Sequence, residues 1–381
     1  MKKIHNKTRT TKKKQIDYGS IDPLLLGIVM ILILIGLIMI ASAGIAYGEA
    51  RFDDPYHFLK RQMIYVVIGL GALFVTQKVD YHFFRRWSFV LFMGAIALLV
   101  LVLIPGIGGD VYGASRWIKI GPLSFQPSEA VKLALILYFA AWFASRGTKT
   151  VRKFSEGVVW FVGILLVVGF LIMMQPDMGT MMMITVIALA IFFLAGARMQ
   201  HIAAIMTGGV VLLFVLIKSA PYRAERLMTF LNPSLDPQGA GYQINQALLA
   251  IGSGGVFGLG LGFSRQKHLY LPEPVGDSIY AVIGEEMGLL GGLVIIFLFI
   301  GFLLRGLKIA NNAPDVFGRL VAGGIVVWIV FQALFNIAAI TGLVPLTGIP
   351  LPFISYGGTS IVFMLMAIGI LLNISKQSDL K

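Results

Sequence analysis

Residues 268–292 read HLYLPEPVGDSIYAVIGEEMGLLGG and place three carboxylates at the start of an apolar, glycine-rich stretch. Asp277 comes directly before the apolar run, while Glu285 and Glu286 lie about 12 Å further along if the stretch is helical. Charge within a membrane is costly, and acids inside a span are candidates for function. The stretch therefore predicts a membrane helix with an acidic outer end.

The composition of the whole chain agrees with a membrane protein. Of its 381 residues, 57% are hydrophobic and 13% are charged, whereas soluble domains are about 25% charged. Runs close to the ~20 apolar residues that a span requires occur ten times, at 24–46, 63–77, 87–104, 128–145, 157–174, 179–197, 201–218, 278–304, 317–342 and 357–374. We therefore expect an all-α polytopic membrane protein with about ten transmembrane helices.

The distribution of basic residues predicts the orientation. Most of the 31 Lys and Arg fall in segments that are inside if the N-terminus is inside, as the positive-inside rule requires. Both termini are therefore expected in the cytoplasm. The organisation is a basic tail (1–20), a transmembrane domain (21–375) with a large outer loop (about 219–277) before the eighth helix, and a short C-terminus (376–381).

Several classes of function are excluded by the sequence. The basic start MKKIHNKTRTTKKK lies directly before a span, which is typical of a topology signal or lipid anchor, so no nucleic-acid partner is expected. The apolar run from Leu24 to Ile40 is longer than the core of a signal peptide, which favours a retained helix. Cysteine is absent and the five histidines are scattered, so we expect neither disulfides nor a protein-held metal.

Asp277 has two compatible interpretations. It precedes a predicted helix and can cap it, or it can act as a carboxylate whose basicity is raised by partial desolvation at the membrane boundary. Glu285 and Glu286 are either functional or a buried pair bonded to neighbouring helices.

Other outer segments carry further candidates. Glu129 and Lys132 are three residues apart and can pair on one helix face, or Lys132 can hold an anion; the preceding QPSE, from Gln126, resembles a helix start with Ser128 as a possible cap. Arg116 in GASRWI fits interface anchoring. Asp177 in QPDMGT is expected to be structural.

The loop motif GYQINQALLAIGSGGVFGLGLG (241–262) predicts a short amphipathic helix followed by tight glycine turns. Because no βαβ unit accompanies the glycines, a nucleotide site is rejected.

The outer side offers one well-placed carboxylate and several cations, at Arg116, Lys119, Lys132, Arg223, Arg226, Arg265 and Lys267. A glycosidase needs two carboxylates, since its leaving group must be protonated. A pyrophosphate leaving group needs cations, and only the attacking hydroxyl needs a base. This set favours glycosyl transfer from a lipid-linked pyrophosphate over hydrolysis.

Six motifs in order carry a family resemblance: GASRWI, FQPSEAVKL, QPDMGT, GYQINQALLAIGSGGVFGLGLG, LPEPVGDSIYAVIGEEMG and TGIPLPFISYGGTS. From about residue 20 to 375 the chain resembles the SEDS family (shape, elongation, division and sporulation), with PEPVGDS closer to the FtsW-like division branch than to the RodA-like branch. Many members read HTDFIF where this chain reads VGDSIY. Members polymerise lipid II into peptidoglycan strands at the bacterial cytoplasmic membrane, here expected at the septum.

The resemblance implies roles for individual residues. Asp277 matches the essential aspartate and would deprotonate the acceptor hydroxyl. Glu129 and Lys132 match acid and base positions of the fourth-helix motif. A wider predicted set lines the cavity or supports it: Arg116, Arg265, Lys267 and Ser355 in the cavity, and Glu285, Glu286, Gln126 and Asp177 as supports.

The resemblance also implies partners, namely lipid II, a class B penicillin-binding protein and other divisome or elongasome membrane proteins. No cofactor is required by these residues, and a divalent cation, Mg²⁺ or Mn²⁺, bound with the pyrophosphate is the one candidate. Two rival functions remain open at this point: a lipid II flippase, because broken helices are also a transporter feature, and a non-catalytic scaffold for the penicillin-binding protein.

Overall fold

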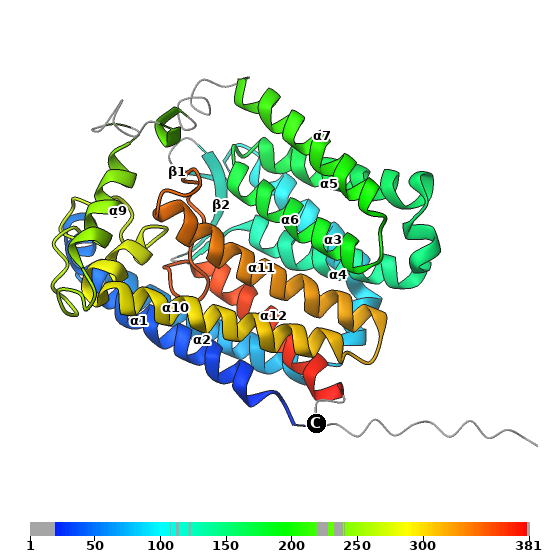
Figure 1. Cartoon of the computed structure of the whole chain (residues 1–381), viewed down its shortest axis with the longest axis horizontal. Helices are drawn as coiled ribbons and strands as arrows, with labels where there is room; N and C mark the ends of the chain where they lie inside the picture. The colour runs from blue at the N-terminus through cyan, green and yellow to red at the C-terminus, as the bar shows by residue number, and fades with distance from the viewer. Residues whose placement is uncertain are drawn as a thin grey trace, which may run out of the picture.

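The computed structural model describes residues 20–106, 108–111, 114–121, 123–218, 228–231, 239 and 241–378. Within these residues ten apolar helices pack into one bundle (Figure 1). They are α1 (Pro23–Phe52), α2 (His57–Lys78), α3 (Tyr81–Val102), α4 (Pro127–Val151), α5 (Val159–Met173), α6 (Met178–Leu194), α7 (Met199–Lys218), α10 (Ile279–Asn311), α11 (Val316–Ile340) and α12 (Gly358–Gln377). Nine spans have the length and hydropathy to cross a membrane, and α6 is a shorter apolar helix. The predicted membrane-protein class is confirmed. The basic tail up to residue 19, Arg223 and Arg226 lie outside the described residues.

Two helices begin about two turns earlier than their apolar runs indicated. α2 begins at His57 and α3 at Tyr81, and the first two turns of each contain His, Lys or Arg side chains that interrupt the apolar run. The start of α3 is fixed by Asp80, whose carboxylate accepts from the backbone N–H of His82 at 2.9 Å, a typical N-cap bond.

The centre of the bundle is formed by α4, α11 and α12, which are the most buried of the spans. α12 packs along α2, and α11 packs against α10, α6 and α4. By contrast α7 is almost entirely exposed, and many large apolar side chains point outward from the peripheral helices. Such an apolar outer surface is what a bilayer solvates.

A small antiparallel sheet, which the sequence analysis did not predict, lies between α3 and α4. Its strands β1 (Gly108–Val111), β2 (Ala114–Ile120) and β3 (Leu123–Phe125) pair in sequence order. β3 is held by Tyr65, whose hydroxyl accepts from the backbone N–H of Ser124 at 2.8 Å, and by the Thr359 hydroxyl, which donates to the Ser124 carbonyl at 2.9 Å. The sheet thereby fixes the point at which α4 begins.

α10 is interrupted at Gly288, where φ is +66°. The interruption leaves backbone carbonyls of α10 without partners inside the helix. The glycine-rich loop after α9 (Tyr242–Ser253) supplies the missing hydrogen-bond donors. The N–H groups of Leu259 and Gly260 donate to the carbonyls of Glu285 and Glu286 at 2.9 and 3.0 Å. A Cβ at Gly258 would lie 2.2 Å from the Glu286 carbonyl oxygen, so glycine is required for this close approach.

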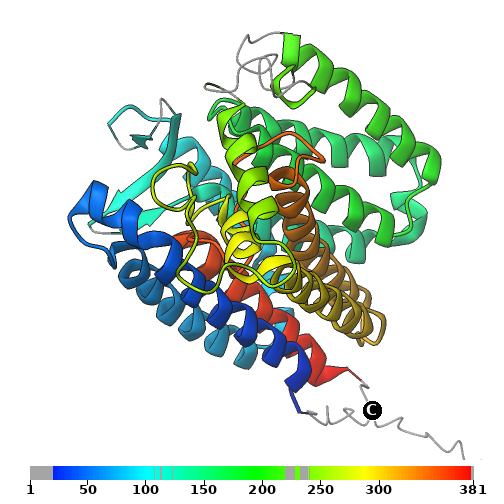
Figure 2. The same cartoon turned by 60° about the vertical axis from the view of Figure 1, so that its left-hand side comes forward.

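The motif-bearing segments gather at one end of the bundle. Figures 1 and 2 show α9, the sheet and the connection from α11 to α12 at that end, with the start of α1 and the C-terminus at the other. At the latter end the backbone N–H of Asp22 donates to the Ser375 hydroxyl at 3.3 Å. The fold therefore places the candidate site far from both ends of the described chain.

Candidate functional site

Asp277 lies in the turn that leads into α10, and it does not cap that helix. The residue at the N-cap is Ser278, and Gln243 of α9 donates to Asp277 Oδ1 at 3.2 Å and to the Ser278 hydroxyl at 3.0 Å. The turn is also held from the α11–α12 connection: Ser355 Oγ donates to the Gly276 carbonyl at 2.7 Å, and the N–H of Tyr356 to the Val275 carbonyl at 2.8 Å. Two separate segments, α9 and the α11–α12 connection, therefore hold the turn that carries the carboxylate.

The environment of Asp277 makes it a stronger base than an ordinary aspartate. Burial raises the pKa of its carboxyl from 3.8 to about 6, and the negative charge of Glu273 acts in the same direction, whereas the hydrogen bond from Gln243 opposes the shift. Desolvation and a like charge both disfavour ionisation. A carboxylate with a pKa just below neutral is largely ionised at pH 7 and can still accept a proton.

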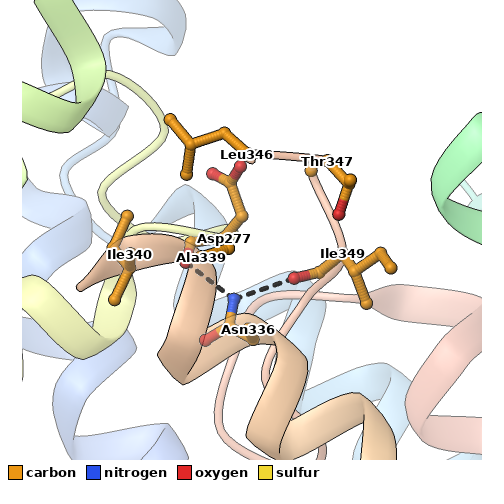
Figure 3. A pocket seen from close by; sticks show the side chains of 8 residues that line it. Asp277, Asn336, Ala339, Ile340, Leu346, Thr347 and Ile349 are labelled. Atoms are coloured by element: carbon orange, nitrogen blue, oxygen red, sulfur yellow. Dashed lines mark hydrogen bonds between the residues drawn. The ribbon is translucent and has the colours of Figure 1, made fainter. Parts of the chain in front are cut away.

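A small pocket adjoins Asp277 and is lined by the end of α11 and by residues 346–349 (Figure 3). Its cavity volume is about 10 Å³, close to the minimum that one water needs, so it has room for one small group such as a hydroxyl. The hydroxyl of Thr347, another lining residue, is buried without a hydrogen-bond partner. The pocket can thus hold the reacting hydroxyl of a larger molecule beside the carboxylate.

Glu129 and Lys132 form a buried ion pair on α4. Lys132 Nζ lies 2.7 Å from Glu129 Oε1, and both side chains are 3–4% exposed. Lys132 also donates to Gln332 Oε1 at 3.3 Å and lies over the ring of Trp328. Ser128 does not cap α4, since the N-cap is Gln126, and the Ser128 hydroxyl has no partner. The unpartnered Glu129 Oε2 leaves a polar group in the core that can accept one more hydrogen bond.

Glu285 and Glu286 hold the loop that precedes Asp277. Glu285 accepts from the hydroxyl of Ser264 and from the N–H of Arg265, at 2.5 and 2.9 Å. Glu286 pairs with Lys267 at 2.8 Å. The Lys267 ammonium donates also to Ser42 Oγ and to the Gly262 carbonyl, so all three of its donors are engaged. The supporting role predicted for the two glutamates fits this geometry, whereas Lys267 is placed as an internal counter-ion with no donor directed at a substrate.

Arg116 and Asp177 meet at the start of α6. Asp177 accepts from the N–H of Thr180 at 3.0 Å and caps α6, which agrees with its predicted structural role. Arg116 Nε donates to the Gln175 carbonyl at 2.8 Å, and its guanidinium lies 3.9 Å from Asp177. Arg116 therefore ties the sheet to the turn before α6.

The remaining predicted residues have distinct settings. Ser355 is buried and bonds backbone groups on both sides, accepting from the N–H of Leu351 at 2.8 Å. The backbone N–H of Gln126 donates to the Thr359 hydroxyl at 3.1 Å, which joins the starts of α4 and α12. Arg265 is exposed, so its guanidinium is open to a ligand.

Three uncharged amides at the site were missed by the sequence analysis. Besides Gln243, they are Gln332 and Asn336 on α11, which are 0% and 2% exposed. An isolated Gln or Asn inside an apolar helix is a detectable signal, because a buried amide needs partners. No motif, however, indicated what those partners would be.

The described residues contain no group of three or more His, Asp or Glu side chains that could hold a metal ion. They therefore do not fit a resident metal. The predicted Mg²⁺ or Mn²⁺ accompanying a pyrophosphate stays a prediction, and no step of the proposed reaction goes through a metal.

The fold and the site define a class of protein: a polytopic membrane protein. It has a carboxyl group with a raised pKa at one end of its bundle and a buried ion pair in its core. Comparison with known proteins gives the family. The family model described as cell cycle protein, which covers FtsW, RodA and SpoVE, matches residues 22–380.

Similar proteins include the stage V sporulation protein E of Bacillus subtilis (strain 168), 46% identical with 97% of this chain and 99% of that protein covered. The chain is 42% identical to the probable peptidoglycan glycosyltransferase FtsW of Trichlorobacter lovleyi, with 95% of each covered. A solved structure from work on the structural coordination of polymerization and crosslinking by a peptidoglycan synthase complex matches with a TM-score of 0.79 at 25% identity, covering 95% of this chain and 99% of that one. The chain belongs to the FtsW/RodA/SpoVE family.

Proposed function

We propose that this protein is a peptidoglycan glycosyltransferase that polymerises lipid II at the outer face of the bacterial cytoplasmic membrane. The observation that carries the proposal is the carboxylate of Asp277, with a pKa of about 6, beside a pocket large enough for a hydroxyl group. The family relatives named as glycosyltransferases support the same reaction class. The outward orientation follows from the distribution of Lys and Arg.

Asp277 is the general base of the proposed reaction. It takes the proton from the 4-hydroxyl of the acceptor GlcNAc as that oxygen attacks C1 of the donor MurNAc. The new C1–O4 bond forms while the bond from C1 to the undecaprenyl pyrophosphate oxygen breaks, and the electron pair leaves with the pyrophosphate. A single displacement of this kind inverts the configuration at C1.

The pyrophosphate leaves as an anion, so it needs positive charge and no acid. Arg265 is an exposed cation in the loop that precedes Asp277. Lys132 is a buried cation on α4, and its pairing with Glu129 offsets part of the cost of burying its charge. Oriented positive groups of this type stabilise the charge that develops on a leaving oxygen.

The protein is proposed to act at the division septum with a class B penicillin-binding protein and other divisome or elongasome membrane proteins. The similar solved structure comes from a peptidoglycan synthase complex in which polymerization and crosslinking are coordinated, and this likeness supports such a partner. The exposed apolar side chains of α7 and the other peripheral helices provide a surface on which the transmembrane helix of a partner can pack.

The proposal is tested with purified protein in proteoliposomes that contain fluorescent lipid II. If the protein is a polymerase, glycan strands form from lipid II supplied on the outer side and are detected by electrophoresis. A flippase would instead transfer lipid II between leaflets, detected by a membrane-impermeant quencher, without forming strands. Transfer without polymer, both with and without a class B penicillin-binding protein, would overturn the proposal.

A further inference from the structure

Two buried amides on α11, Gln332 and Asn336, are separated by one helical turn and so share a face. Both donate to backbone carbonyls of the same short segment: Gln332 Nε2 to Pro350 at 2.9 Å, and Asn336 Nδ2 to Ile349 at 2.8 Å. The two side chains therefore hold the 349–350 segment, which adjoins the Asp277 pocket, by hydrogen bonds. Amides buried in an apolar span are costly without such partners.

Each amide also contacts one residue that carries a charge in the proposed site. Asn336 Nδ2 donates to the backbone carbonyl of Asp277 at 2.8 Å (Figure 3). One turn earlier on α11, Gln332 Oε1 accepts from Lys132 Nζ at 3.3 Å and from Trp328 Nε1 at 3.0 Å. One face of α11 therefore connects the turn that carries the base to the buried Glu129–Lys132 ion pair.

We propose that Gln332 and Asn336 are positioning residues that set the location of Asp277 relative to Lys132 through the 349–350 segment. The inference rests on the proposed glycosyl transfer. Asn336 contacts the backbone of Asp277 and not its carboxylate, so it acts on where the base sits. Gln332 orients the Lys132 ammonium in the same way. Reaction rates are sensitive to such placement, and a displacement of about 1 Å can cost ~100-fold.

A purely structural role is the alternative, and the chain offers a matched control for it. Asn373 on α12 is 3% exposed and bonds backbone groups in the same manner, donating to the Gln77 carbonyl at 2.9 Å and accepting from the Tyr81 N–H at 3.0 Å. It lies at the opposite end of the bundle, near the C-terminus. Asn373→Leu removes equivalent bonds without touching the site.

The experiment measures lipid II polymerisation and thermal unfolding for Asn336→Leu, Gln332→Met and Asn373→Leu, normalised to folded protein. We expect the two α11 variants to lose about 10- to 100-fold in kcat with KM changed by less than about twofold, because binding is kept while placement is lost. Asn373→Leu should lose similar thermal stability and keep its kcat. The double α11 variant should lose less than the product of the single losses, since both residues hold one segment.

The proposal is overturned if Asn336→Leu and Gln332→Met keep the kcat of Asn373→Leu, or if they raise KM alone. Should Asn336→Leu fail to fold, the same criteria apply to Gln332→Met, which preserves side-chain volume. Asp277→Asn is measured beside them. If Asp277→Asn polymerises like the wild type, the proposed function fails. If it is inactive while both α11 variants are fully active, only the positioning role fails.

Discussion

Replacing Asp277 by Asn is expected to make the protein more stable at alkaline pH while it abolishes polymerisation. The folded protein raises the pKa of this carboxyl from 3.8 to about 6. An acid with a raised folded pKa favours folding while it is protonated, and this contribution is lost as the pH rises through about 6. At pH 8 the wild type therefore carries a carboxylate that the fold disfavours, and asparagine removes this cost.

The size of the effect follows from the shift. A shift of about 2 units corresponds to ~3 kcal/mol. Because the side chain keeps partial contact with solvent, we expect about 1–2 kcal/mol in practice. The difference should be largest at pH 8, should shrink as the pH falls through 6, and should vanish below pH 4, where the wild-type group is protonated in both states.

The assay is thermal unfolding in detergent, followed by tryptophan fluorescence, at a series of pH values. Asp177→Asn serves as the control, because asparagine also caps helices and Asp177 caps α6. We expect no stabilisation from the control at pH 8. An Asp277→Asn protein that is less stable than the wild type at pH 8 would refute the reasoning, since it would show that the ionised carboxylate is well satisfied.

Three further predictions concern the reaction and its orientation. The polymerisation rate should rise with pH and reach half its maximum near pH 6, because the base must be ionised; a rate independent of pH from 5 to 8 would contradict Asp277 as the base. Lys132→Ala should lower activity and stability far more than Lys119→Ala, by about 3–5 kcal/mol in unfolding free energy, because it leaves a buried Glu129 charge unpaired; equal stability of the two variants would show that the core tolerates the lone acid. A single cysteine at exposed His268 should react with an impermeant thiol reagent added to cells whose outer barrier is opened, and one at exposed Thr148 only after lysis; the opposite pattern would invert the topology.

The fold could be predicted from the sequence to the extent that the membrane dictates it. Long apolar runs have few alternatives to spanning helices, and all ten predicted runs are helical in the structure. The sheet of residues 108–125 was missed because its strands are short, lie between helices and have no clear apolar alternation. The early starts of α2 and α3 were missed because the His, Lys and Arg side chains in their first two turns lower the mean hydropathy there.

Within the site, the charged residues could be found and their connections could not. Asp277, Glu129 and Lys132 stand out because charge is rare in an apolar chain. The bonds made by Gln332 and Asn336 depend on how α11 meets the 349–350 segment. The contact between α11 and this segment is set by tertiary packing, which one sequence does not reveal. For the same reason Lys267 looked available to a substrate, although the fold directs it to Glu286.

The most direct test of the central claim is the synthesis of glycan strands from purified lipid II by the wild-type protein and by Asp277→Asn, each purified with its class B penicillin-binding protein. Both proteins must give the same elution profile and retain the partner equally. If Asp277 is the general base, the wild type forms strands and the variant forms none at pH 7.5. Strand synthesis by the variant at the wild-type rate would contradict the assignment of Asp277 and with it the proposed mechanism.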